Sequence, residues 1–159
     1  MASNHVSYLD PIVLAIATPR KLNFMARDDL FRNAFFGWFI YSLGAFPVKR
    51  ESADLSALKE AIRRLKQGKV LVLFPEGSRA FEGRSNEPQP GIGFLAAKSS
   101  VPIIPAFIKG ADIALPKGAK KIRSTEIDVY FGPQISIEGR LPYEDIAANV
   151  MVNIRRLAC

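Results

Sequence analysis

Histidine, cysteine and tryptophan each occur only once in the 159 residues of this chain. A single cysteine, Cys159, excludes an intrachain disulfide and suits a reducing compartment. Because no histidine is near it in the sequence, Cys159 is also a poor candidate for a nucleophile. His5 is the only imidazole, and imidazole is the side chain whose unperturbed pKa best suits proton transfer near neutral pH. If the chain performs acid–base chemistry, we expect His5 to take part.

Acidic residues are also scarce, since 15 Asp and Glu stand against 22 Lys and Arg and give a net charge of +7. This balance favours a polyanionic partner such as nucleic acid, a phosphorylated metabolite or an anionic membrane. No basic-aromatic nucleic-acid motif accompanies the charge, so we expect no nucleic-acid partner. Residues 34–48 lack charge, but Gly37, Gly44 and Pro47 interrupt them, and the run is too short to span a bilayer. It could lie against one.

The length and the composition, with 48% apolar and 23% charged residues, fit one globular domain. We find no repeat or linker and expect residues 1–159 to form a single domain. No signal peptide precedes His5. A catalytic turn from strand to helix normally follows a strand, and residues 1–3 are too few to form one. We therefore expect an N-terminal strand and any membrane anchor to lie outside this sequence, and we expect low or no activity from these residues alone.

Hydrophobic patterning predicts alternating strands and helices, and hence an α/β fold with a mostly parallel central sheet flanked by helices. The best-specified helix covers residues 53–67. Residues 69–74 form a continuous apolar run, which is typical of a strand covered on both faces. The other predicted strands cover residues 22–26, 45–48, 101–108 and 126–131, and the other helices cover residues 12–17, 28–44, 91–100 and 142–157. Residues 91–96 match the dinucleotide pattern G-x-G-x-x-A, but no strand precedes them, so we reject that interpretation.

Two predicted helices have unusual faces. Residues 12–17 are apolar all round, as expected of a short buried helix. The helix over residues 28–44 is dense in aromatic rings: Phe31, Phe35, Phe36, Trp38, Phe39 and Tyr41. Packing in the core is the simpler interpretation of these rings. A face that touches lipid or an acyl chain is the alternative.

A carboxylate follows the only histidine after five positions. Residues five apart on a helix are turned by about 140° from each other, so His5 and Asp10 can meet only if the backbone changes direction between them. Asp10 and Pro11 suit a helix start, with aspartate at the N-cap and proline at the first helical position. Two interpretations stay open. Asp10 is either a helix cap beside a loop histidine or the partner of a catalytic imidazole.

Four segments resemble, in order and spacing, the motif blocks of the glycerolipid acyltransferases related to lysophosphatidic acid acyltransferase. Residues 4–10 contain His-x4-Asp, and residues 44–51 read Gly-Ala-x-Pro-Val-Lys-Arg-Glu. Residues 74–79 read Phe-Pro-Glu-Gly-Ser-Arg, and residues 101–106 read Val-Pro-Ile-Ile-Pro-Ala. Together the blocks extend over most of the chain.

This resemblance implies an acyltransferase-like fold and the transfer of a fatty acyl group from acyl-CoA or acyl-carrier protein to a lysophospholipid hydroxyl. The implied acceptor is 1-acyl-sn-glycerol-3-phosphate, and glycerol 3-phosphate is another candidate. His5 would take the hydroxyl proton and Asp10 would orient the imidazole, without an acyl-enzyme intermediate. No cofactor or metal is expected, because the acyl thioester is a substrate.

The resemblance also implies an acceptor site. Arg79, and after it Arg50, are expected to bind the phosphate, since guanidinium suits bidentate recognition of phosphate. Glu76, Gly77 and Ser78 are expected to shape the acceptor pocket, and a backbone N–H near Gly77 could hold the oxyanion. We expect an anionic membrane surface as a further partner. The protein would then lie on the cytoplasmic side of a membrane, peripheral or anchored through a segment absent here. The alternative is a non-catalytic basic module that binds membranes.

Overall fold

The computed structural model describes residues 1–49, 54–77, 88–116, 118–119, 121–137, 139 and 141–158. Three predicted site residues, Arg50, Ser78 and Arg79, lie outside this part of the chain. The elements, in order, are β1 (Ala2–Ser3), α1 (Asp10–Ala17), β2 (Leu22–Arg27), the 3₁₀ helix η1 (Asp28–Phe31), α2 (Ala34–Ser42), β3 (Ala45–Val48), α3 (Leu55–Lys66), β4 (Val70–Val72), α4 (Gly91–Ser99), β5 (Pro105–Lys109), α5 (Ala111–Ala114), β6 (Asp128–Phe131) and α6 (Tyr143–Arg156).

The strands form two three-stranded sheets that meet at β1. Their orders are β3-β2-β4 and β1-β5-β6, and a parallel bridge between Ala2 and Leu73 joins them. Among the described strands, all pairs are parallel except β5 with β6, so the predicted mostly parallel sheet is confirmed. The expectation that the residues before His5 are too few for a strand is wrong. Ala2–Ser3 pair with β5 and stand in the middle of the joined sheet.

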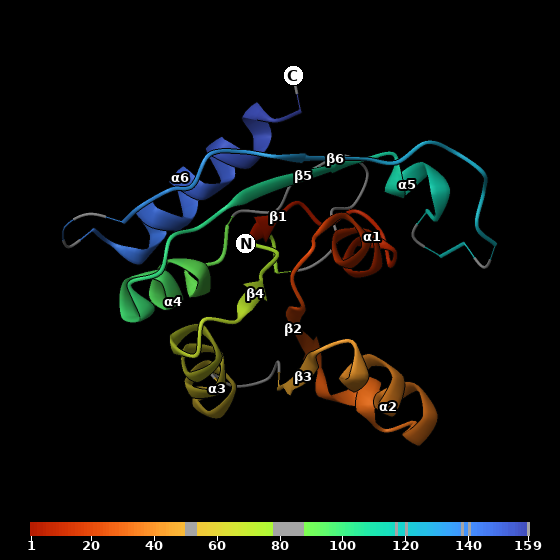
Figure 1. Cartoon of the computed structure of the whole chain (residues 1–159), viewed down its shortest axis with the longest axis horizontal. Helices are drawn as coiled ribbons and strands as arrows, with labels where there is room; N and C mark the ends of the chain where they lie inside the picture. The colour runs from red at the N-terminus through yellow and green to blue at the C-terminus, as the bar shows by residue number, and fades with distance from the viewer. Residues whose placement is uncertain are drawn as a thin grey trace.

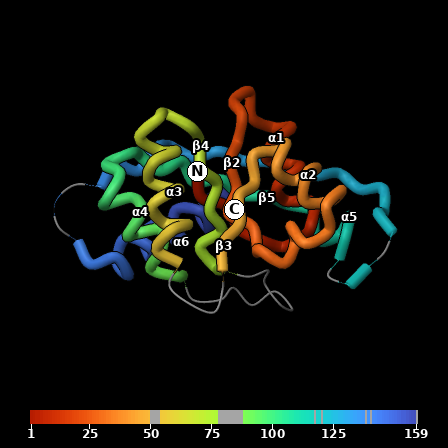
Figure 2. Tube along the Cα trace, turned by 90° about the horizontal axis from the view of Figure 1, so that it is seen from below, coloured from red at the N-terminus to blue at the C-terminus, as the bar shows by residue number. Residues whose placement is uncertain are grey.

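Helices pack on both faces of the sheet. Figure 1 shows α3 and α4 on one side of β4 and α1 on the other, and Figure 2 shows the same division from below. The side chains of β4 alternate accordingly. Leu71 packs with Ala61 of α3 and Leu95 of α4, whereas Val72 packs with Leu14 of α1. Helix α6 runs along β5 and packs against α4 (Figure 1).

Two glycines allow backbones to come unusually close. Gly44, in the second motif block, has φ of +94°, and a Cβ there would lie 2.2 Å from the Leu22 carbonyl oxygen. The turn from α2 into β3 therefore requires glycine. A Cβ on Gly93 of α4 would lie 2.1 Å from the Tyr143 carbonyl oxygen at the start of α6. Gly93 thus serves the packing of two helices.

The predicted helix over residues 28–44 is two elements. Asn33 separates η1 from α2, and its side chain caps α2 by accepting a hydrogen bond from the Phe36 N–H at 2.9 Å. This cap, which competes with a continuous helix, is the physical reason for the break.

The apolar side chains of α1 and α2 are largely exposed. In α1 only Asp10 and Leu14 are buried, and Ile16 is 82% exposed, so the expectation of an all-round buried helix is wrong. In α2 only Gly37 is buried, while Phe35 is 79% and Trp38 67% exposed. Core packing is therefore the wrong interpretation for the rings of α2. Among the described helices, none is both long and apolar enough to cross a bilayer.

Candidate active site

His5 and Asp10 meet where the chain leaves the sheet. β1 ends at Ser3, the chain turns, and α1 begins at Asp10. The His5 Nδ1 lies 2.7 Å from the Asp10 Oδ2. The change of direction required by the five-residue spacing therefore exists, and it brings the two predicted catalytic side chains together.

Asp10 organises this turn and does not cap the helix. Its side chain is fully buried, and Oδ2 also accepts hydrogen bonds from the N–H groups of Val6 at 2.7 Å and Ser7 at 2.8 Å. The N-cap position is Leu9, and no side chain caps α1. The interpretation of Asp10 as a simple cap is therefore wrong. One carboxylate oxygen holds both the turn and the imidazole.

The His5 ring is fixed on a second side by Phe74. The two rings stack with centroids 4.1 Å apart and an angle of 19° between their planes. The imidazole remains 20% exposed. In the tautomer that donates from Nδ1 to Asp10, the lone pair of the imidazole is on Nε2.

Glu76 supports the main chain of His5. It is 4% exposed, and the His5 backbone hydrogen-bonds to its carboxyl group. Burial raises the pKa of Glu76 above its ordinary value, and the bond from His5 opposes this effect. The Oε2 atom is buried and has no hydrogen-bond partner among the residues that the structure describes. Glu76 therefore lies beside the predicted base, as expected of a site residue, although part of its carboxyl group is unsatisfied.

Gly77 and Ser7 are occupied by structural hydrogen bonds. The Gly77 N–H donates to the Phe74 carbonyl at 3.0 Å in a tight turn with φ of +67°. The predicted oxyanion donor is therefore not this N–H in its present conformation. The Ser7 hydroxyl donates to the Leu115 carbonyl at 2.9 Å and is buried. Ser7 is accordingly not directed towards the imidazole as a nucleophile would be.

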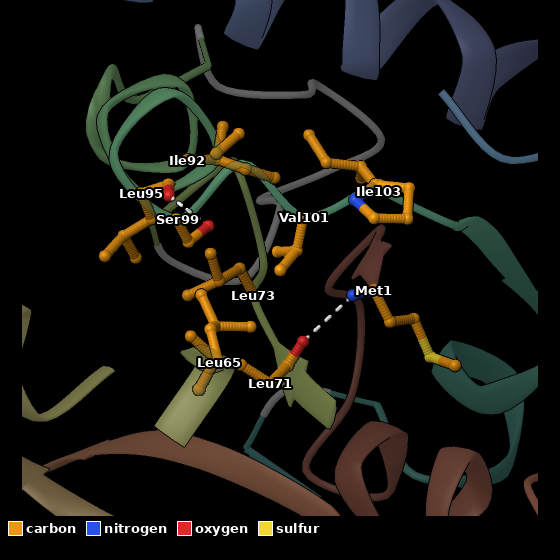
Figure 3. A pocket seen from close by; sticks show the side chains of 11 residues that line it. Met1, Leu65, Leu71, Leu73, Ile92, Leu95, Ser99, Val101 and Ile103 are labelled. Atoms are coloured by element: carbon orange, nitrogen blue, oxygen red, sulfur yellow. Dashed lines mark hydrogen bonds between the residues drawn. The ribbon is translucent and has the colours of Figure 1, made fainter. Parts of the chain in front are cut away.

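Of two cavities in the described part of the chain, one borders the candidate site. This cavity, of about 350 Å³, is lined by Asn4, Val6 and Glu76, with Lys109 and Arg155 among its charged residues. The other, of about 40 Å³, lies between β4, α3 and α4, and Figure 3 shows the aliphatic side chains around it. This small cavity is a gap in core packing. Within the described parts of the chain, no group of three or more His, Cys, Asp or Glu side chains could hold a metal ion.

Sequence reasoning missed the role of Phe74. It was assigned to a motif block but not to the site, because its contact with His5 requires β1 and the end of β4 to be neighbours. Whether these two segments lie side by side depends on the order of the strands in the sheet, which a single sequence does not provide. The only available signal was that Phe74 ends an apolar run that is typical of a buried parallel strand, and that carboxyl ends of such strands gather ligand-binding residues.

The fold holds an imidazole against a buried carboxylate at the end of a strand of an α/β sheet, an arrangement that general-base sites use. A family model described as Acyltransferase matches residues 1–109. The chain belongs to this acyltransferase family.

Similar proteins agree with this assignment. The chain is 35% identical over 156 residues to the 1-acyl-sn-glycerol-3-phosphate acyltransferase of Streptococcus pneumoniae (strain ATCC BAA-255 / R6), which covers 96% of this chain and 56% of that protein. It is 33% identical over 112 residues to the enzyme of the same name from Bacillus subtilis (strain 168). This match covers 69% of this chain and 55% of that protein. The crystal structure of the 1-acyl-sn-glycerophosphate acyltransferase PlsC from Thermotoga maritima matches with a TM-score of 0.82 and 26% identity, over 99% of this chain and 64% of that one. The chain thus spans little more than half the length of the Streptococcus and Bacillus relatives.

Proposed function

We propose that this chain carries the catalytic site of an O-acyltransferase that converts 1-acyl-sn-glycerol-3-phosphate to phosphatidic acid. The observation that carries the proposal is the 2.7 Å contact of the His5 Nδ1 with the buried Asp10. The relatives named 1-acyl-sn-glycerol-3-phosphate acyltransferase support the choice of acceptor. Glycerol 3-phosphate is the second candidate acceptor.

The dyad suggests direct transfer. Nε2 of His5 removes the proton from the acceptor hydroxyl while the hydroxyl oxygen attacks the thioester carbonyl carbon. The new C–O bond gives a tetrahedral intermediate, whose collapse breaks the C–S bond. The thiolate then receives the proton from the imidazolium, and Asp10 stabilises that cation throughout. The donor is a thioester of coenzyme A or acyl-carrier protein, and the reaction as written needs no cofactor.

The acceptor's phosphate would bind to Arg79 and Arg50, and Ser78 would line the same pocket. Glu76 and Gly77 would shape its glycerol end. The position of Glu76 against the His5 backbone supports this part of the proposal. A planar guanidinium that binds two phosphate oxygens would also orient the free hydroxyl towards Nε2.

We also propose that the protein works against an anionic membrane surface, on its cytoplasmic side. The exposed rings of α2 and exposed aliphatic residues of α1 support such a contact, as does the net charge of +7. Both substrates carry acyl chains, so a site next to lipid would receive them without exposing those chains to water.

The decisive experiment measures transfer of a labelled acyl group to 1-acyl-sn-glycerol-3-phosphate, with acyl-CoA and with acyl-carrier protein as donors. The His5→Ala variant should lose activity by several orders of magnitude while keeping its circular dichroism spectrum. Equal rates for wild type and His5→Ala would refute the proposal. Binding to anionic vesicles without turnover of any donor would instead favour the non-catalytic membrane module.

A further inference from the structure

Asn4, immediately before His5, makes two hydrogen bonds to one residue of β5. Its Oδ1 accepts from the Ile108 N–H at 2.7 Å, and its Nδ2 donates to the Ile108 carbonyl at 2.9 Å. Asn4 is 6% exposed and Ile108 is 1% exposed. A single side chain therefore satisfies both main-chain groups of a buried strand residue.

The strand register shows what these bonds replace. Ala2 pairs with Pro105 and Ser3 with Ala106, so the offset between the strands is 103 residues. Continued by the same offset, position 5 would face Ile108, because 5 + 103 = 108. In a parallel ladder a residue bonds to the neighbours of the residue that it faces, as the Ala2 N–H does with the Ile104 carbonyl, so main-chain groups of residues 4 and 6 would serve Ile108. The Val6 N–H donates to Asp10 instead, the His5 backbone hydrogen-bonds to Glu76, and the Asn4 side chain bonds to both main-chain groups of Ile108.

We propose that Asn4 is a positioning residue for His5. A strand that ends early would leave the N–H and the carbonyl of buried Ile108 without partners, which is unfavourable. The carboxamide of Asn4 has one acceptor and one donor, as a peptide group has, so it completes the ladder. The main chain of His5 is then free to turn away from the sheet. The imidazole reaches Asp10 and Phe74 from that turned backbone.

The chain offers a matched control for this residue. Asn23 of β2 is 5% exposed, and its Nδ2 donates to the Val70 carbonyl of the neighbouring strand at 3.1 Å. It lies in the other half of the joined sheet and is not adjacent to the dyad in sequence. Asn4→Asp and Asn23→Asp each replace a donor by an acceptor and preserve side-chain volume. Both variants lose a buried interstrand hydrogen bond, but only the first should disturb His5.

The spectroscopic test uses the single histidine. Protein labelled with ¹⁵N-histidine should give one Nδ1–H resonance, shifted downfield by its bond to Asp10. We expect Asn4→Asp and Asn4→Ala to lose or broaden this resonance, and Asn23→Asp to retain it. If Asn4→Ala does not fold, Asn4→Asp, which keeps the side-chain volume, decides the question.

The kinetic test rests on the proposed acyl transfer. Because a small misplacement of a catalytic group costs about 10²-fold in rate, kcat of Asn4→Asp should fall by that order, with KM changed by less than about threefold. The proposal is overturned if folded Asn4→Asp keeps the wild-type resonance and kcat. It is also overturned if Asn4→Asp and Asn23→Asp have the same Tm and lose the resonance and kcat to the same extent. Absence of acyl transfer in the wild type would count against the proposed function only, since the resonance still decides the role of Asn4.

Discussion

One oxygen atom of Asp10 accepts three hydrogen bonds, from the His5 ring and from two N–H groups of the turn. Asp10→Asn removes the negative charge that stabilises the imidazolium but preserves the size of the side chain. We expect kcat for acyl transfer to fall by about 10³–10⁴-fold, as in other histidine–carboxylate sites. Steady-state kinetics measures this loss. The control is Asp145→Asn, which removes an exposed carboxylate in the first turn of α6, and equal kcat values for the two variants would count against the assignment.

The buried Glu76 should make stability depend on pH. Its pKa is raised above the ordinary value of 4.5 by burial, so the folded state holds the proton more tightly than the unfolded chain does. The associated stability is complete below the ordinary pKa and is lost as the pH rises through the raised value. Glu76→Gln stays neutral, and we expect its Tm, relative to wild type, to increase from acid to neutral pH.

Thermal unfolding at a series of pH values measures this difference. Glu144→Gln, which changes an exposed carboxyl group in the first turn of α6, is the matched control and should follow the wild type. Parallel Tm curves for wild type and Glu76→Gln would show that the carboxyl group does not ionise in this range.

At the scale of elements, α2 presents its rings to solvent instead of to the core. Trp38 is the only tryptophan and is 67% exposed, so its fluorescence reports directly on this helix. We expect a blue shift of its emission when anionic vesicles are added. Phe35→Ser should weaken vesicle binding by about tenfold, because burial of a phenylalanine contributes about 1.5–3 kcal/mol.

Val152→Ser, on α6, is the control for this prediction, since Val152 is also exposed but lies on another helix. It should bind vesicles as the wild type does. An unchanged tryptophan emission, or equal weakening by both substitutions, would show that α2 is not the element in contact with lipid.

The parts of the structure that could be predicted are those that depend on neighbours in the sequence. The strands other than β1 and the amphipathic helix α3 follow from apolar patterning, and the meeting of His5 with Asp10 needs only a turn within six residues. The stacking of Phe74 on His5 could not be predicted, because it depends on the order of β1 and β4. Nor could the exposure of α1 and α2 be predicted, because a segment that is apolar all round gives no signal of which side faces solvent.

At the scale of the whole molecule, the packing of α4 against α6 includes one close approach. The missing side chain of Gly93 lets α4 come against the Tyr143 carbonyl of α6. We expect Gly93→Ala to lower the free energy of unfolding by about 1–3 kcal/mol, because an added methyl group would force the two helices apart. Denaturant unfolding measures the change.

Gly91→Ala, in the same helix, is the matched control. No atom lies within 4 Å of a Cβ at Gly91, so the substitution should be neutral or slightly stabilising. Equal destabilisation by both variants would mean that glycine matters here for the helix itself and not for its packing against α6.

The position of β1 also bears on the order of events during folding. His5 and Asp10 are close in sequence and can meet early, but β1, the strand that leads into them, pairs with residues 105 and 106, more than a hundred positions later. Contacts of such long range form slowly and only after the intervening chain is available. During synthesis, the imidazole and its carboxylate would therefore emerge before β5, and their supporting strand would pair only after β5 is available. A folding assay that follows the His5 resonance should detect this delay relative to helix formation.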